Sequence, residues 1–187
     1  VVDPDGPNSI TIFNGINGAV IYNYSGPNGD PWNSYTIVNN PNGTLSRIYV
    51  VGYNSGTIYE FNSTLNLIKT IVLQAPSTEQ EQTLVAANLV KNGGTELIYR
   101  TELPNGTNEV YVLNATTLSI LWIKFLPNMS NGPVIVSAIG NNSVNSILLT
   151  GNEMTILSPP SSFSQNIYTI TFTENGLPSG TSWSVTL

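Results

Sequence analysis

The sequence predicts an all-β fold assembled from repeated units of four short strands. Segments rich in Ile, Val, Tyr and Thr alternate with turn signals of Asn, Gly and Pro along most of the chain. The turns also recur at a spacing near fifty residues, which indicates a structural repeat. The recurring turn asparagines are Asn42, Asn92 and Asn142 in one series, and Asn14, Asn62 and Asn114 in a second series.

The chain begins with a partial unit and continues with three cycles. Residues 1–8 carry no strand period, and residues 10–13 and 19–22 form a hairpin around an Asn-Gly turn. The connectors between cycles contain Gly, Pro and polar runs. The strands predicted for the three cycles are residues 35–38, 47–51, 57–61 and 67–73, then 83–87, 96–100, 109–113 and 119–126, then 133–138, 146–150 and 153–157.

Four strands in a unit of about fifty residues are typical of propeller blades. A meandering β-sandwich is the alternative, because it also has evenly spaced strands. About three blades and a fragment are present, whereas closed propellers need at least four. We therefore expect either a longer protein, closure with a partner chain, or a fold that is not a propeller.

Three segments resemble the blades of FG-GAP/VCBS and PQQ-like propellers: residues 84–98, residues 109–122 and residues 10–22. The resemblance covers roughly residues 9–158 and implies a propeller-like fold without a specific function. FG-GAP blades often carry an aspartate-rich calcium loop, but the matching positions here are Asn88, Asn92 and Glu96. These bring little negative charge for a hard dication, so we expect no calcium. Nothing resembles a PQQ-binding floor, and no cofactor is expected.

The last part of the chain predicts a separate β-hairpin. Residues 159–166 form a linker rich in Pro and Ser, and two alternating segments follow. A lone hairpin is marginal in water, so its apolar face is expected to pack on a domain or on another subunit. The expected assembly residues of this face are Tyr168, Ile170, Phe172, Trp183, Val185 and Leu187.

Residues 168–187 closely resemble the opening of a small Ig-like repeat that is common in secreted proteins of thermoacidophilic archaea. The resemblance implies an extracellular archaeal surface protein and a domain that continues beyond Leu187. The predicted organisation is therefore a propeller-like domain over 1–158, a linker over 159–166, and a partial Ig-like domain over 167–187.

Charged residues make up only 9% of the chain, against about 25% in average proteins, and the net charge is −6. So few Lys and Arg residues argue against nucleic-acid binding, which depends on phosphate contacts. No apolar run approaches the ~20 residues of a membrane span. Without His or Cys, the chain lacks the usual catalytic and metal-binding groups, so we expect no enzyme. The acidic residues Glu79, Glu81, Glu96, Glu102 and Glu109 are expected to be solvated.

Seven Asn-x-Ser/Thr sequons are candidates for N-glycosylation, although this composition gives about five by chance. Most of them stand beside turn signals, where a glycan would reach solvent. The candidates are Asn23, Asn42, Asn62, Asn105, Asn114, Asn128 and Asn141.

Three functional hypotheses follow. The first is a non-enzymatic glycoprotein of the cell surface with a structural, adhesive or assembly role, whose partners are copies of itself or other surface chains. The second is a filament subunit that donates a β-strand to its neighbour. The third is a carbohydrate-binding or carbohydrate-acting module that uses carboxylates and tryptophans. Packing is the expected role of Trp32, Trp122 and Trp183.

Overall fold

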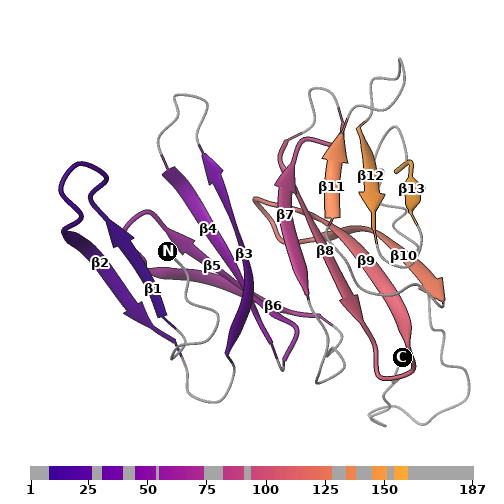
Figure 1. Ribbon diagram of the computed structural model, residues 1–187, viewed down its shortest axis with the longest axis horizontal. Coiled ribbons are helices and arrows are strands. Elements are labelled where there is room, and N and C mark those ends of the chain that lie inside the picture. The colour runs from indigo at the N-terminus through magenta and orange to yellow at the C-terminus, as the bar shows by residue number, and fades with distance from the viewer. Residues whose placement is uncertain are drawn as a thin grey trace, which may run out of the picture.

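The computed structural model describes residues 9–26, 31–39, 45–53, 55–73, 82–90, 94–127, 134–137, 145–150 and 154–159. All secondary-structure elements within these residues are β-strands, so the predicted all-β class is confirmed (Figure 1). The strands form several antiparallel sheets, and within each sheet the strands pair in their order along the chain. The predicted C-terminal hairpin and all of the predicted linker after residue 159 lie outside the described residues.

The strands fall into four sheets, numbered here from the N-terminus. The first sheet contains β1 (Ser9–Phe13) and β2 (Val20–Ser25). The second contains β3 (Trp32–Asn39), β4 (Leu45–Gly52), β5 (Thr57–Asn62) and β6 (Leu67–Val72). The third contains β7 (Thr83–Ala87), β8 (Glu96–Glu102), β9 (Thr107–Asn114) and β10 (Ile120–Pro127). The fourth contains β11 (Val134–Ser137), β12 (Ser146–Leu149) and β13 (Thr155–Leu157).

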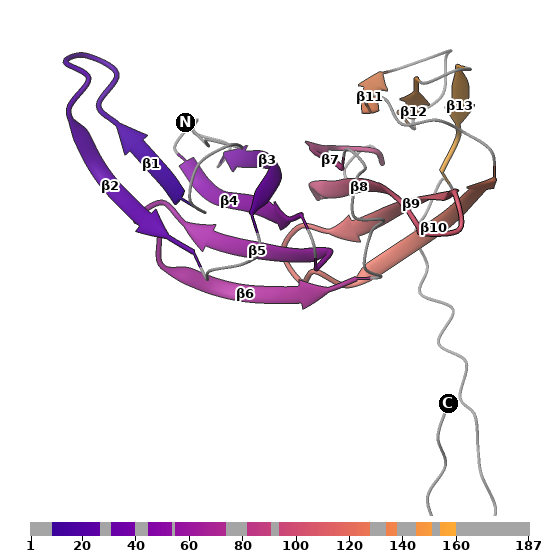
Figure 2. The same ribbon diagram turned by 60° about the horizontal axis from the view of Figure 1, so that its bottom comes forward.

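The sheets follow one another in chain order, face to face, with the first sheet and the fourth sheet at opposite ends (Figures 1 and 2). Three hydrophobic clusters fill the three spaces between consecutive sheets. The two middle sheets are therefore covered on both faces. This explains why their central strands are continuous apolar runs instead of alternating with polar residues.

Strand β4 shows how one strand serves two cores. Ile48 and Val50 point toward the first sheet, while Tyr49 and Val51 point toward the third sheet. In β8, Leu97 faces the preceding sheet in the same way as Ile48. In β12, Ile147 again faces the preceding sheet. The repeat of about fifty residues therefore places equivalent side chains in equivalent interfaces.

The predicted asparagine hairpins are confirmed at Asn14, Asn62 and Asn114. In each turn the asparagine side-chain oxygen accepts a backbone N–H two residues later. The turns at Asn62 and Asn114 also contain a leucine with a left-handed backbone, Leu65 at φ 58° and Leu118 at φ 57°. This conformation is unfavourable for leucine, but both side chains are buried between sheets. Asn42, Asn92 and Asn142 lie outside the described residues.

The first strands of successive sheets also lie beside each other: β3 contacts β7, and β7 contacts β11. Two hydroxyl groups on β3 join it to β7. The backbone N–H of Leu84 donates to Ser34 Oγ at 2.9 Å, and that of Ala86 donates to Thr36 Oγ1 at 3.0 Å. Because β7 is the edge strand of its sheet, these side chains satisfy backbone groups that β8 does not reach.

Candidate functional site

A cavity of about 140 Å³ opens between the second sheet and the third sheet. Strands β4 and β5 supply the charged side of the cavity, and the turn after β9 supplies the facing wall. The lining residues are Val38, Arg47, Tyr49, Glu60, Thr95, Ala115 and Thr116.

An ion pair forms one side of this cavity. Arg47 Nε donates to Glu60 Oε1 at 2.8 Å. The side chain of Glu60 is 4% exposed, whereas that of Arg47 is 41% exposed. The bond stabilises a carboxylate that would be costly to bury alone, while the guanidinium keeps contact with solvent.

Tyr49 crosses from the second sheet to the third. Its hydroxyl donates to the carbonyl oxygen of Ala115 at 2.6 Å. Burial, together with the nearby Glu60 carboxylate, raises the pKa of Tyr49 well above its ordinary value. The phenol therefore stays protonated and acts as a hydrogen-bond donor between sheets, which makes it unsuitable as a base.

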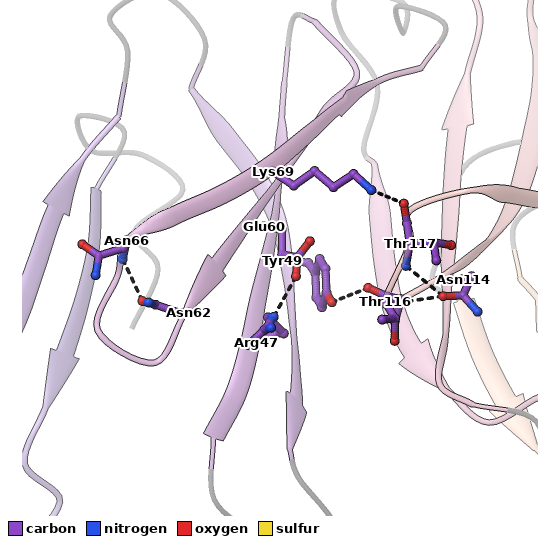
Figure 3. Close-up of polar contacts among 10 residues, drawn as sticks. Arg47, Tyr49, Glu60, Asn62, Asn66, Lys69, Asn114, Thr116 and Thr117 are labelled. Atoms are coloured by element: carbon purple, nitrogen blue, oxygen red, sulfur yellow. Dashed lines mark hydrogen bonds and ion pairs between the residues drawn. The ribbon is translucent and has the colours of Figure 1, made fainter.

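The asparagine turn after β9 is held rigidly at the same junction (Figure 3). Asn114 Oδ1 accepts the backbone N–H groups of Thr116 and Thr117, both at 2.9 Å. Lys69 of β6 reaches across and donates to the carbonyl oxygen of Thr117. The residues around the cavity thus connect the two sheets, and the one carboxylate in its lining, Glu60, is paired with Arg47.

A second buried polar cluster joins the third sheet to the fourth. Arg100 Nε donates to Asn108 Oδ1 at 3.0 Å, and its terminal nitrogen donates to the carbonyl oxygen of Thr150 at 2.9 Å. Burial lowers the pKa of Arg100, and the nearby Glu102 partly offsets this effect. This cluster was not predicted from the sequence, in which the available signal is a single arginine directly after the apolar run Leu97–Tyr99.

The expectation of solvated carboxylates is wrong for Glu96 and Glu109, because both are buried. Glu96 Oε2 accepts the backbone N–H of Leu89 at 2.8 Å, and Glu109 accepts the hydroxyl hydrogen of Tyr111. Burial raises the pKa of Glu96, and the bond from Leu89 partly offsets it. Glu109 on β9 pairs with Thr101 on β8, which is an odd number of residues from Glu96. Because side chains alternate along a strand, the Glu96 and Glu109 carboxylates point to opposite faces of the sheet. Glu102 is half-buried at the end of β8, and Glu79 and Glu81 lie outside the described residues.

The described tryptophans pack against hydrophobic clusters. Trp32, which precedes the predicted strand over residues 35–38, is the first residue of β3 and is buried. Its ring stacks on Tyr24 with centroids 6.0 Å apart. Trp122 packs against the cluster between the third and fourth sheets. These positions agree with the expected packing role, with Trp32 buried and Trp122 half-buried. Trp183 lies outside the described residues.

Four of the seven sequon asparagines are described. Asn23 is exposed on β2, and Asn105 is exposed in the turn between β8 and β9. Asn62 and Asn114 are half-buried at the asparagine turns, where their side-chain oxygens accept backbone N–H groups. Asn42, Asn128 and Asn141 lie outside the described residues.

The expected assembly residues Tyr168, Ile170, Phe172, Trp183, Val185 and Leu187 also lie outside the described residues. In the part of the chain that is described, no three His, Cys, Asp or Glu side chains gather as a metal-binding group. The same part contains no helix that is long and apolar enough to span a membrane.

No protein-family model and no curated protein matches this sequence. Among solved structures, the chain is similar to Sqt1 of Saccharomyces cerevisiae, with 14% sequence identity and a TM-score of 0.44. The match covers 82% of this chain and 53% of Sqt1, so the chain spans about half the length of that protein. A likeness this weak carries no argument about function.

Proposed function

We propose that this chain is a non-enzymatic protein of the cell exterior with a structural or adhesive role, and that its sheets are blades of a propeller-like array. The face-to-face order of the sheets and the neighbouring positions of β3, β7 and β11 support the blade arrangement. A chain in which only 9% of the residues are charged, with polarity carried mainly by Asn, Ser and Thr, supports the exterior location, because few of its groups titrate with external pH.

The observation that carries the exterior location is the position of the sequons. Asn105 stands exposed in a turn, and its side-chain oxygen accepts the backbone N–H of Thr107 at 2.9 Å. The side-chain amide nitrogen of Asn105, to which an N-linked glycan would attach, takes no part in this bond. Asn23 is likewise exposed, and Asn62 and Asn114 stand at hairpin turns.

Mass spectrometry of the protein from its native cells tests this proposal. We expect the peptide that contains Asn105 to carry a glycan, seen as an added mass in hexose-sized steps. Thr107→Ala is expected to remove that glycan, whereas Thr107→Ser is expected to keep it because the sequon survives. An Asn105 peptide found only in its unmodified form would contradict the glycosylated exterior role.

A second candidate function is that of a filament subunit that assembles by strand donation. The supporting observation is an apolar region on β3, formed by Tyr35 and Ile37, which are 47% and 46% exposed. Strand β3 is an edge strand of its sheet, and exposed apolar residues on an edge strand favour the addition of strands from another chain. Light scattering over a concentration series tests this function, and a monomer at every concentration would contradict it.

A further inference from the structure

Three polar side chains form a row across one end of the third sheet, where β7 begins and β8 ends (Figure 1). Thr101 on β8 pairs with Glu109 on β9. Gln82 immediately precedes β7, and continuation of the β7–β8 register brings it opposite Thr101. Because directly opposed residues of an antiparallel pair share a face, the three side chains lie side by side on one face of the sheet.

This row faces the second sheet. Thr101 is two residues after Tyr99, which packs in the hydrophobic cluster between the second and third sheets, so both side chains point the same way. Gln82 reaches across the same interface, because its Nε2 donates to the carbonyl oxygen of Tyr53 at 2.7 Å. All three members of the row are buried, with Gln82 4%, Thr101 0% and Glu109 1% exposed.

Two oxygen atoms of the row have no hydrogen-bond partner among the described residues, namely Oγ1 of Thr101 and Oε1 of Gln82. The bond to Tyr53 fixes the orientation of the Gln82 amide, since only its nitrogen can donate to a carbonyl oxygen. The unpaired atom of the Gln82 amide is therefore its oxygen. Buried polar atoms almost always have a partner in the protein, in ordered water or in a bound ion.

The third member of the row is a carboxylate without a nearby positive charge. Glu109 accepts a hydrogen bond from the neutral hydroxyl of Tyr111, and no lysine or arginine in the described part of the chain forms an ion pair with it. Arg100 is next to Thr101 on β8, but its side chain points to the opposite face and donates to Thr150. A buried carboxylate is costly unless a positive charge compensates it.

The row thus presents oxygen atoms together with one negative charge. Oxygen ligands, without nitrogen or sulfur, select hard cations. One carboxylate balances the charge of a monovalent cation, whereas it would leave a divalent cation such as calcium partly uncompensated. Neighbouring Cβ atoms in such a row are about 5 Å apart, so the three side chains can converge on a single ion.

The second sheet lacks this charge at the equivalent position. Thr57 occupies that position, 52 residues before Glu109, and the same interval separates the turn asparagines that follow the two strands. The Thr57 hydroxyl bonds to the Ser55 hydroxyl, with the two oxygens 2.7 Å apart. The row of oxygens around a buried carboxylate is therefore a feature of the third sheet and does not follow from the repeat itself.

We propose that Gln82, Thr101 and Glu109 bind a monovalent alkali cation, sodium or potassium, between the second and third sheets. The carboxylate supplies the charge, and the hydroxyl and amide oxygens supply neutral ligands. The ion stabilises the junction between the two sheets, because Gln82 also bonds to the chain at the end of β4. This site is independent of the surface role proposed above.

Thermal unfolding in matched salts tests the site. The chain is unfolded in sodium chloride, potassium chloride and tetramethylammonium chloride at equal ionic strength, since the last cation is too large for three side chains to enclose. We expect a melting temperature about 3–6 °C higher in the preferred alkali salt, at a tenfold excess of that cation over its Kd. The larger of the two alkali shifts identifies the ion. Equal melting temperatures in all three salts would overturn the proposal.

Three variants locate the ion. Glu109→Gln removes the charge at nearly constant shape and should abolish the alkali-specific shift. Glu96→Gln is the matched control, because it removes a buried carboxylate on the opposite face of the same sheet, and it should keep the shift. Thr101→Val removes one ligand oxygen and should weaken the shift, which keeps the test decisive where Glu109→Gln does not fold. An undiminished shift in Glu109→Gln or in Thr101→Val would contradict the site.

Crystallography with rubidium distinguishes an ion from an ordered water. Rubidium replaces other alkali cations and gives an anomalous signal that water does not give. We expect an anomalous peak among Gln82 Oε1, Thr101 Oγ1 and the Glu109 carboxylate. A water at this place without anomalous signal would show that the row binds solvent, and the proposal would fail.

Discussion

Phe13 and Phe61 occupy the same position in consecutive sheets, one residue before the turn asparagine. Phe61 is fully buried, whereas Phe13 is 44% exposed. Leu113 is in the same position of the third sheet and is fully buried. The residues are chemically alike, but among the described sheets only Phe61 and Leu113 lie in a cluster shared with a preceding sheet. Position in the array, more than residue type, therefore decides what each side chain contributes to stability.

The largest expected effect is a direct test of this comparison. Phe61→Ala should lower the free energy of unfolding by about 3–5 kcal/mol, because it leaves a cavity between two sheets. Phe13→Ala should cost less than about 1 kcal/mol, because its side chain is already half exposed. Urea unfolding of the two variants measures both values, and equal losses would show that Phe13 is covered in solution.

A second comparison concerns two cations that bridge neighbouring sheets. Arg100 is buried between the third and fourth sheets, whereas Lys69 reaches Thr117 at an exposed position. Arg100→Ala should cost about 3 kcal/mol, since it leaves Asn108 and a carbonyl group without their buried donor. Lys69→Ala should change stability by less than about 0.5 kcal/mol. Thermal unfolding of the two variants measures both losses of stability. A larger loss from Lys69→Ala than from Arg100→Ala would show that Lys69 is the more important bridge between sheets.

The left-handed leucines test whether burial offsets backbone strain. Leu118→Ala and Leu118→Gly both lose the buried side chain, but glycine also relieves the strain at φ 57°. We expect the glycine variant to be more stable than the alanine variant by about 1 kcal/mol. At Leu113, in regular strand, the order should be opposite because glycine weakens strands. Chemical denaturation of the four variants measures both differences, and the same order at both positions would exclude strain at Leu118.

The smallest expected effect concerns pH. Because burial raises the pKa of Glu96, the folded state holds its proton over a range where the unfolded state has lost it. Stability from this group is therefore complete below about pH 4.3, the ordinary glutamate pKa, and is lost as pH rises through the folded pKa. Glu96→Gln keeps the acceptor for Leu89 but does not ionise.

We expect Glu96→Gln to equal the native chain in stability at pH 3 and to exceed it at pH 7. The urea midpoint at several pH values measures this difference. A difference that stays constant across the range would show that ionisation of Glu96 does not affect folding. Unfolding of Phe61→Ala at the same pH values serves as a control for general loss of packing.

Much of the strand order followed from local signals. Asn14, Asn62 and Asn114 marked hairpins because an asparagine side chain bonds to its own turn, independently of the rest of the fold. The spacing of these turns predicted the repeat for the same reason. The exposed sequon asparagines Asn23 and Asn105 also followed from local context.

The polar junctions could not be predicted in the same way. Tyr49 and Ala115 are joined across 66 residues, and Arg100 and Thr150 across 50. Nothing local at either partner indicates the other. Glu96 and Glu109 were expected to be solvated because each stands at the start of a predicted strand, directly after a polar turn, but the sheets that bury them come from distant segments.

The sequence by itself determined the all-β class, the turns and the period of the repeat, because each depends on residues within a few positions of one another. Only the tertiary structure decided which faces are buried, which carboxylates lose water, and where the array is uncovered. Those properties depend on the neighbouring sheet, and the local sequence around Phe13 or Phe61 does not indicate whether a neighbouring sheet covers the side chain.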